Sequence, residues 1–419
     1  TWPTPQTAQQ HAGTDRLYEE IRSEEHNNPT DFDSEEYPWF GEEPTLTLRD
    51  LLPSAEAEGY EPVVSYDDER WEELMMGCDE EEMIALINNG AYHTLAMESV
   101  GLPATIHGDG PSGFTCFMSK EQVNGTCQYV SEPVMASTWN INLMNELGEA
   151  IGEEGTIGDK ATGQPYSSIY APGVNIHRSP LNGRNFEYFS EDPVISGKMA
   201  SAIISGCASQ GLVTTIKHFV LNDQESNRAG IYTWADEQTM REIYLKAFEI
   251  PIKETKCCGI MSAFDRLGTV WCGASSALLN DLLRTEWGFE GFVVSDYSSN
   301  FTGTGYMNPV LAVYNGNDTI LTGIWALNKP SHVAAIKLAY RRDPIGFGKA
   351  LREACKNLCI AKMQTRAFLH PEKVYDDSLA ASLQKPSDWN FEFPYAFSAL
   401  RYVLNNTMNV VLWLLRYVL

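Results

Sequence analysis

The chain has 419 residues, 43% of them hydrophobic, which is enough to bury a large core in one barrel with additions or in two domains. Its 56 acidic against 30 basic residues give a formal net charge of −26. Such a surface repels nucleic acid and anionic membranes and suits a soluble enzyme that acts on neutral substrates such as sugars. The nine cysteines are scattered without a CxxC pair, so we expect buried thiols in a reducing compartment and no metal or cofactor.

The first 70 residues are acidic and weakly periodic, which predicts an extended arm or a linker (1–70). The opening stretch, TWPTPQTAQQ, has neither a basic n-region nor an apolar h-region. The sequence therefore predicts no signal peptide and a cytoplasmic location. No Met stands at the start, which leaves open that the sequence begins inside a longer protein.

Beyond the arm, short apolar runs alternate with amphipathic helices. We expect helices where apolar residues recur at helical spacing, at 79–92, 194–207, 236–252 and 276–287. The apolar runs are typical of strands buried on both faces and lie at 103–106, 168–176, 211–219, 258–264, 291–296 and 317–321.

This alternation predicts an α/β fold whose parallel strands are joined by right-handed crossovers. A (β/α)8 TIM-like barrel and an open doubly wound sheet both fit the pattern. No GxGxxG or P-loop motif follows a strand, which disfavours the nucleotide-binding version, although two of the barrel's eight strands cannot be placed. We predict a barrel at 71–362 and an irregular segment with an apolar C-terminal helix at 363–419. The final VVLWLLRYVL is too short to span a bilayer; a packing helix is favoured over an anchor or a truncated longer helix.

Polar residues stand where several of these runs end. Asp109 follows the first run, and Arg184 lies in the polar stretch after the second. Lys217 and His218 end the third run, and Asp296 ends the fifth. A barrel would gather these ends on one rim, where loops form the active site. The carboxylates would accept hydrogen bonds from sugar hydroxyls and the cations would donate to others.

These residues also have structural alternatives. Asp109 suits a turn, and Asp296 suits a cap of the following loop. Arg184 is equally suited to an ion-pair network with Glu187 or Glu191 beneath the rim. That all of the polar ends are structural at once is the least favoured interpretation.

Several long motifs carry a resemblance to a known family. IHGDGPSGF, GRNFEYFSEDP, KHFVLNDQESNR, EQTMREIYLKAFE and EWGFEGFVVSDY, with the later YNGNDTIL, resemble the barrel domain of glycoside hydrolase family three, of the β-glucosidase type. The resemblance runs in order from Asp79 to Leu321, about 240 residues. It implies a (β/α)8-type barrel and retaining hydrolysis of a terminal, non-reducing β-linked sugar by double displacement.

The resemblance also implies roles for single residues. By position, Asp296 matches the family's nucleophile. Phe264 stands where many members carry a Tyr near the nucleophile, so this substrate contact departs from the family's pattern. The positions that match ligands of the non-reducing-end sugar are Asp109, Arg184, Lys217 and His218.

The second carboxylate does not follow from the barrel motifs, because the family's β-glucosidases carry it on a separate domain. The N-acetylglucosaminidase branch uses a His-Asp pair on the loop after KHF, and the absence of a His in 220–228 disfavours that branch. Glu225 is the in-chain acid that we nominate for the acid/base role, although a ligand role or an ion pair with Arg228 is the favoured alternative.

Two hypotheses for the function follow. The leading one is a retaining β-glycosidase, a β-glucosidase or β-xylosidase, that acts on a small oligosaccharide or glycoside. The alternative is a sugar-binding but catalytically incomplete barrel that lacks an acid/base-bearing accessory domain. TWPTPQT and TLTLRDLL resemble the stretch before the barrel in members whose accessory domains come first, which implies such domains upstream. A homo-oligomer stays open.

Overall fold

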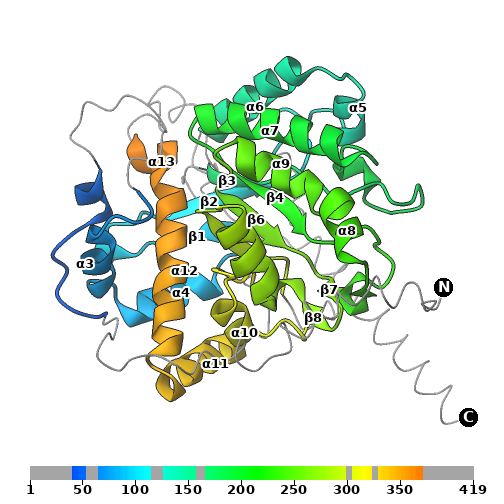
Figure 1. The fold of residues 1–419 in the computed structure, drawn as a ribbon. Helices are drawn as coiled ribbons and strands as arrows, with labels where there is room; N and C mark the ends of the chain where they lie inside the picture. Colours follow the sequence, from blue (N-terminus) through cyan, green and yellow to red (C-terminus); the bar gives the residue numbers. More distant parts are fainter. Residues whose placement is uncertain are drawn as a thin grey trace, which may run out of the picture.

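The fold is shown in Figure 1 as a computed structural model, which describes residues 40–52, 65–114, 126–156, 166–298, 304–322 and 329–370. Most of the predicted arm and the whole predicted C-terminal helix lie outside these residues. The described piece of the arm packs on the core, because Leu48 and Leu51 of η1 (Leu48–Leu51) are buried. The predicted domain limits remain predictions.

A six-stranded sheet in the order β1-β2-β3-β4-β6-β9 forms the centre of the fold. All neighbouring strands pair in parallel except β1 with β2, which are antiparallel. The result is a mixed α/β fold with a half-barrel sheet. The strands are β1 (His93–Thr94), β2 (Thr105–Asp109), β3 (Tyr166–Tyr170), β4 (Val213–Phe219), β6 (Gly259–Ser262) and β9 (Phe292–Ser295).

The sequence located this sheet closely. Three of the six predicted runs contain the parallel strands β4, β6 and β9, and two more overlap β2 and β3, whereas the short β1 had no predicted run. The sixth run, 317–321, joins β9 through one parallel bridge between Val294 and Thr319. The parallel α/β architecture is therefore confirmed, and the complete ring of eight strands remains a prediction.

Helices flank the sheet, and the four predicted ones correspond to α4, α7, the run from α8 to α9, and η8. Both η6 and η8 are π-helical. The helices are α3 (Arg70–Met76), α4 (Glu80–Asn88), α5 (Glu132–Ala136), α6 (Ile141–Gly155), α7 (Pro193–Ser209), α8 (Glu237–Thr239), η6 (Met240–Tyr244), α9 (Lys246–Glu254), η8 (Ala277–Glu286), α10 (Pro309–Tyr314), α11 (Lys329–Arg342), α12 (Gly346–Met363) and α13 (Arg366–Leu369).

Shorter elements lie in the loops. The 3-10 turns are η2 (Glu98–Val100), η4 (Asn185–Glu187), η5 (Arg228–Gly230) and η7 (Cys272–Ala274). A second sheet in the order β5-β7-β8 consists of β5 (Tyr232–Thr233), β7 (Arg266–Leu267) and β8 (Val270–Trp271). This small sheet joins the loop after β4 to the loop after β6.

The segment after α4 connects the two edges of the central sheet. On one side, Gly90 N donates to Ile320 O (2.9 Å) and Ile320 N donates to Ile87 O (2.8 Å). On the other side, His107 N of β2 donates to Tyr92 O (2.8 Å). Residues 87–92 therefore link 319–320, which lies beside β9, to the opposite edge of the sheet.

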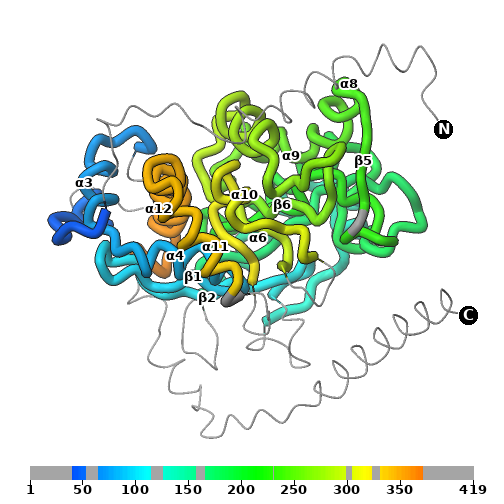
Figure 2. The backbone as a smooth tube through the Cα atoms, turned by 90° about the horizontal axis from the view of Figure 1, so that it is seen from below, coloured from blue at the N-terminus to red at the C-terminus, as the bar shows by residue number. Residues whose placement is uncertain are grey.

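Two hydrophobic clusters share the sheet. The first packs Ile216, Ile260 and Val293 against α6, α7, α9 and η8. The second packs Phe292 and Val294 against α3, α4 and α12. In Figures 1 and 2, α12 accordingly lies near α3 and α4, and α9 lies on the other side of the sheet. Alternate residues of the strands thus serve two different cores, as the continuous apolar runs predict.

A buried polar cluster holds α12 against the strands. Lys362 Nζ lies 2.9 Å from His107 Nε2 and 3.1 Å from Ser167 Oγ. Burial lowers the pKa of Lys362 to about 7, so the amine loses much of its charge near neutral pH, whereas an exposed Lys keeps it. The cluster connects α12 to β2 and β3.

The cysteines are free thiols in the part of the chain that the structure describes. Cys127 is exposed, and the other seven described cysteines are buried. Burial of most thiols was the expectation from the sequence. Within the described ranges, no helix has both the length and the hydropathy needed to cross a bilayer.

Candidate active site

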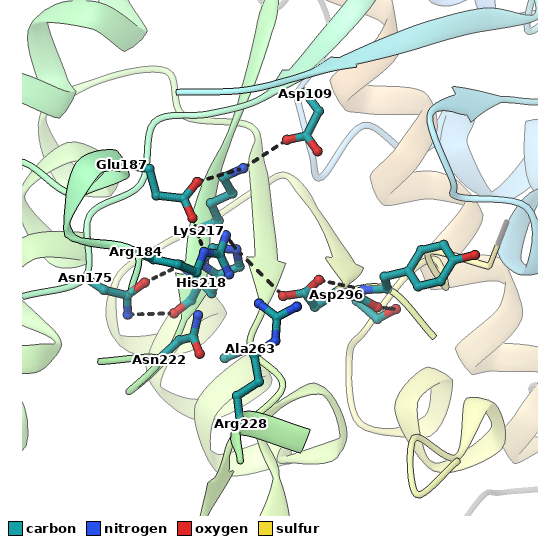
Figure 3. Close-up of polar contacts among 12 residues, drawn as sticks. Asp109, Asn175, Arg184, Glu187, Lys217, His218, Asn222, Arg228, Ala263 and Asp296 are labelled. Atoms are coloured by element: carbon teal, nitrogen blue, oxygen red, sulfur yellow. Dashed lines mark hydrogen bonds and ion pairs between the residues drawn. The ribbon is translucent and has the colours of Figure 1, made fainter. Parts of the chain in front are cut away.

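Side chains from the ends of four strands meet at one end of the central sheet (Figure 3). Asp109 is the last residue of β2, and Asp296 follows β9 directly. Lys217 and His218 are among the last three residues of β4. Arg184 reaches the same place from the loop after β3, just before η4. The sequence expected these five residues on one rim, and the structure brings all five together.

Asp296 has one carboxylate oxygen that is hydrogen-bonded and one that has no hydrogen-bond partner among the described residues. Tyr297 N donates to its Oδ1 (2.6 Å), and Asp296 N donates to Ser262 O of β6 (3.0 Å). Among the described residues, Oδ2 has no hydrogen-bond partner although the side chain is only 10% exposed. The carboxylate is therefore anchored by its backbone and by one oxygen, while the other oxygen remains available to a ligand.

Burial and nearby cations act on the pKa of Asp296 in opposite directions. Burial raises the pKa of Asp296 by more than Arg184 and Arg228 lower it, and the net pKa is about 6. Near neutral pH the carboxyl group is therefore mostly ionised, but it has a basicity well above that of an exposed Asp.

Lys217 joins two acids. Its Nζ lies 3.0 Å from Asp109 Oδ1 and 3.6 Å from Glu187 Oε2. Burial alone would lower the pKa of Lys217, but Asp109 and Glu187 outweigh burial and raise it. Asp109 Oδ2 also accepts from Tyr92 OH (3.3 Å). The amine is thus charged, and it fixes the carboxylate of Asp109 at the mouth of the site.

Arg184 lies at the centre of the site. Its Nε pairs with Glu187 Oε1, its NH2 lies 2.8 Å from His218 Nε2, and its NH1 lies 3.6 Å from Glu225 Oε1. The ion pair with Glu187 that the sequence offered as a structural alternative is present. The ion pair coexists with a position beside His218 and Asp296, so it does not take Arg184 out of the site.

The surroundings of His218 define its protonation. Burial, followed by the charges of Arg184 and Lys217, holds the pKa of His218 well below its ordinary value, so the ring is neutral. Because Arg184 NH2 donates to Nε2, the proton is on Nδ1, which donates to Tyr188 OH (3.2 Å). The 3.7 Å approach of Nε2 to Asp296 Oδ2 is therefore not an ion pair.

A buried amide and a tyrosine hold His218 in this orientation. Asn175 Oδ1 accepts from His218 N (2.7 Å), and Asn175 Nδ2 donates to His218 O (3.0 Å). Tyr188 OH donates to Asn222 O (3.3 Å) and accepts from Asn222 Nδ2 (3.1 Å). The sequence analysis missed Asn175, Tyr188 and Asn222, although each lies within or next to a motif that it quoted.

Glu225 is engaged by cations on two sides. Arg228 NH1 donates to its Oε2 (2.8 Å), and Arg184 NH1 lies 3.6 Å from its Oε1. The ion pair with Arg228, the favoured alternative for Glu225, is thus present. The guanidinium of Arg228 lies 4.4 Å from the centre of the Phe264 ring. Phe264 is buried, and this contact with Arg228 connects its ring to the site.

Two acids of the polar stretch after β3 lie elsewhere. Asp192 caps α7, because its Oδ1 accepts from Val194 N and Ile195 N at 2.8 Å each. Glu191 is exposed beside it. Neither belongs to the cluster drawn in Figure 3.

A further acid near the site had no signal in the sequence. Asp265 is fully buried, and neither of its carboxylate oxygens has a hydrogen-bond partner within the described ranges. Burial, with the charges of Asp223 and Glu225, raises the pKa of Asp265 to about 8. The side chain is therefore mostly protonated at neutral pH. Asp265 owes its raised pKa chiefly to its burial in the loop between β6 and β7, which no sequence pattern indicates.

The arrangement suits a neutral, hydroxyl-rich ligand. Charged donors and acceptors alternate around the open oxygen of Asp296, so several hydroxyls can be bound in fixed positions. The ionised carboxylate can attack an electron-poor carbon, and the cations beside it favour its charged form. No group of three or more metal-ligating side chains occurs among the residues described.

Comparison with known proteins identifies the family. A family model described as the glycosyl hydrolase family 3 N-terminal domain matches residues 77–322. A β-glucosidase of Ruminococcus albus is 40% identical over 212 residues, which are 50% of this chain and 21% of the relative. An exo-α-(1→6)-L-arabinopyranosidase of Bifidobacterium breve is 38% identical over 229 residues, 52% of this chain and 29% of the relative.

Solved structures show the same likeness. The structure of β-glucosidase 3B from Thermotoga neapolitana in complex with α-D-glucose is 34% identical, with a TM-score of 0.62 over 72% of this chain and 44% of that chain. The chain thus spans less than half the length of these relatives. The resemblance drawn from the motifs is confirmed: the chain belongs to glycosyl hydrolase family 3 and contains its N-terminal, barrel-type domain.

Proposed function

We propose that the protein is a retaining β-glycosidase of the β-glucosidase type, with Asp296 as its nucleophile. The observation that carries this proposal is Oδ2 of a buried, mostly ionised Asp296, which has no hydrogen-bond partner among the described residues and lies among paired donors and acceptors. Family membership and the β-glucosidases among the relatives support the same reaction class.

In the first step, Asp296 Oδ2 bonds to the anomeric carbon while the bond to the leaving oxygen breaks, through an oxocarbenium-like transition state. Water then attacks the same carbon and releases the sugar and the free carboxylate. Asp109 and Lys217 would bind hydroxyls of the terminal sugar, and Arg184 would bind a hydroxyl near Asp296. These contacts strengthen in the transition state and therefore raise the rate as well as the affinity.

His218 contributes as a neutral ring in this scheme. A charged imidazolium 3.7 Å from Oδ2 would weaken the nucleophile by pairing with it. The neutral ring, with Arg184 donating to Nε2, leaves the Asp296 oxygen free to react.

The acid/base group is the open part of the proposal. A retaining glycosidase needs a second carboxyl about 5–5.5 Å from the nucleophile. Both carboxylate oxygens of Glu225 already have cationic partners, Arg228 at 2.8 Å and Arg184 at 3.6 Å, which accords with the ion-pair role that is the favoured alternative for this residue. The family and the relatives support hydrolysis over the alternative function, a sugar-binding barrel without its acid/base group.

Leaving-group dependence tests the two functions. If the described site lacks the acid, the chain should cleave dinitrophenyl β-glucoside but hardly any cellobiose, because acid assistance is worth ~10²–10⁴-fold and matters most for a sugar alkoxide. Azide should then accelerate the second step, since this anion needs no base. The rates of both substrates are measured with and without azide.

The control is Glu225→Gln, assayed on the same substrates. Efficient hydrolysis of cellobiose without an azide effect would contradict the incomplete site, and its loss in Glu225→Gln would assign the acid to Glu225. No cleavage of the activated glucoside at all would contradict the glycosidase itself.

The pH profile should depend on Arg228. Because Asp296 reacts as the carboxylate, kcat/KM should rise with pH through the pKa of about 6. Arg228 lowers this pKa, so Arg228→Gln should move the acidic limb to higher pH, by about 0.5 unit. Arg241→Gln, which breaks an exposed pair with Glu237 and Glu286, is the control and should leave the limb in place. A shift to lower pH in Arg228→Gln would contradict the assignment.

Further parts of the proposal follow from the sequence. We propose a small oligosaccharide or glycoside as substrate, a full (β/α)8 barrel with an N-terminal arm and a C-terminal helix, and a cytoplasmic location. An accessory domain or a second copy of the chain would complete the site. The relatives include an arabinopyranosidase as well as β-glucosidases. Rates on a panel of nitrophenyl glycosides would therefore distinguish a glucoside, a xyloside and another sugar as the substrate.

A further inference from the structure

A second cavity lies on the rim beside the candidate active site. Its volume is about 610 Å³, within the range of about 300–1,000 Å³ that is usual for small-molecule sites. The loop 221–224 after β4 forms one wall, and the segment 231–236, which contains β5, forms another. Arg178, Thr239 and Tyr244 complete the lining. Gln224 in this wall precedes Glu225 of the candidate active site, so the cavity and the active site share one loop.

Two aromatic side chains stand exposed on the wall of this cavity. Tyr232 is 55% and Trp234 is 59% exposed. The Tyr232 ring lies 4.7 Å from the guanidinium of Arg266, which in turn lies 3.9 Å from the Tyr306 ring. The stack holds the Tyr232 ring in place before a ligand binds, so ordering this side chain costs little entropy on binding. Rigid, amphipathic rings of this kind suit ligands with both apolar and polar faces.

Polar groups converge on the same space. Asp223 Oδ1 accepts from Ile176 N (2.8 Å), and Asp236 Oδ1 accepts from Thr239 N (2.8 Å). Arg178 NH2 donates to Gln224 Oε1 (3.4 Å). Carboxylate, amide and guanidinium groups that are held in this way can bind several hydroxyls at defined positions.

The charge of the lining narrows the choice of ligand. The lining contains two acids, Asp223 and Asp236, and one arginine, Arg178. The whole chain has a formal net charge of −26, so phosphates and nucleic acid are disfavoured as ligands. An apolar peptide would offer no hydrogen bonds to the acids and the amide of the lining beyond those that they make within the protein. A sugar has an apolar C–H face for the aromatic rings and hydroxyls for the polar groups.

We propose that this cavity is a second carbohydrate-binding site, which binds a neutral oligosaccharide next to the active site. The choice of a β-linked glucose oligomer as probe rests on the proposed function, but binding itself does not. Two sources of the sugar share this chemistry: the distal end of a substrate whose terminal sugar occupies the active site, and a separate glycan chain.

Calorimetric titration with cellotetraose tests the site, in a chain that carries Asp296→Ala so that the ligand is not consumed. Trp234→Ala should weaken binding at least about tenfold, or about 1.4 kcal/mol, because it removes an aromatic face. Trp139→Ala is the matched control, since Trp139 is 74% exposed and lies outside the cavity. Trp234→Phe keeps a ring and should bind nearly as the unsubstituted chain does.

Competition with glucose separates the two sources. If the tetrasaccharide spans both cavities, saturating glucose in the active site should weaken its binding; if a separate glycan binds, glucose should have no effect. With Asp296 intact, Trp234→Ala should cleave a nitrophenyl β-glucoside at the parental rate, because that substrate ends before the second cavity.

Two outcomes would overturn the proposal: equal affinity of Trp234→Ala and Trp139→Ala, or no binding of the tetrasaccharide at about 10 mM by the chain with Trp234. Either result is independent of hydrolysis, so a failure of the glycosidase assignment appears in the rate assays alone.

Discussion

Asp296→Ala should lower kcat on dinitrophenyl β-glucoside by at least about a thousandfold, or about 4 kcal/mol of activation free energy. The carboxylate is the group that bonds to the anomeric carbon, and the described site holds no other oxygen in its place. The fold should survive, because Asp296 is anchored chiefly by its backbone and by one hydrogen bond from Tyr297. Steady-state rates and thermal unfolding of both proteins measure the two effects.

Asp281→Ala is a suitable control, since Asp281 is an exposed acid on η8 outside the site. Mechanism-based labelling with a 2-fluoro glycoside should attach the sugar to the peptide that contains Asp296. Activity of Asp296→Ala above about a hundredth of the parental rate, or a label on Glu225, would show that another residue is the nucleophile.

Lys217→Met should destabilise the fold by about 3 kcal/mol and also slow turnover. The substitution keeps the length of the side chain but removes a buried charge that lies between Asp109 and Glu187. Loss of one partner of a buried pair typically costs about 3–5 kcal/mol. We expect the lower end of this range, because Arg184 still pairs with Glu187 and Tyr92 still donates to Asp109.

The matched control is Lys253→Met, which removes an exposed helical pair with Glu249. Exposed pairs of this kind contribute about 0.3–0.5 kcal/mol. Urea unfolding gives both free energies, and kcat/KM on a nitrophenyl glucoside gives the effect on the site. If the two variants lost the same stability and Lys217→Met kept its kcat/KM, Lys217 would be neither a buried ion-pair partner nor a ligand.

The sequence predicted the strands and the rim well because both depend on local patterns. A parallel strand that is buried on both faces must be apolar along its length, so β4 and β9 are visible as runs. Lys217, His218 and Asp296 stand at the ends of those runs, and one end of a parallel sheet collects them. The family motifs then placed Asp109 and Arg184 in the same cluster.

Other parts of the site depend on contacts between distant segments, which a pattern does not contain. The neutral state of His218 results from burial and then from Arg184, which lies 34 positions earlier and approaches its Nε2. Asp265 is an acid without hydrogen-bond partners among the described residues because the loop after β6, to which it belongs, is buried at that point. The central sheet of the described residues contains one strand that the pattern did not reveal, the two-residue antiparallel β1, and 317–321 contributes a single bridge.

The link between residues 87–92 and 319–320 bears on the order of events during synthesis. The amides of Gly90 and Ile320 each bond across 230 positions of chain, so this contact cannot form until the ribosome has released nearly the whole domain. Until then, β2 to β9 can assemble only as an open sheet with two unpaired edges. A chain arrested before Ile320 would therefore expose those edges to other nascent chains, and such truncated products should depend on chaperones far more than the finished protein does.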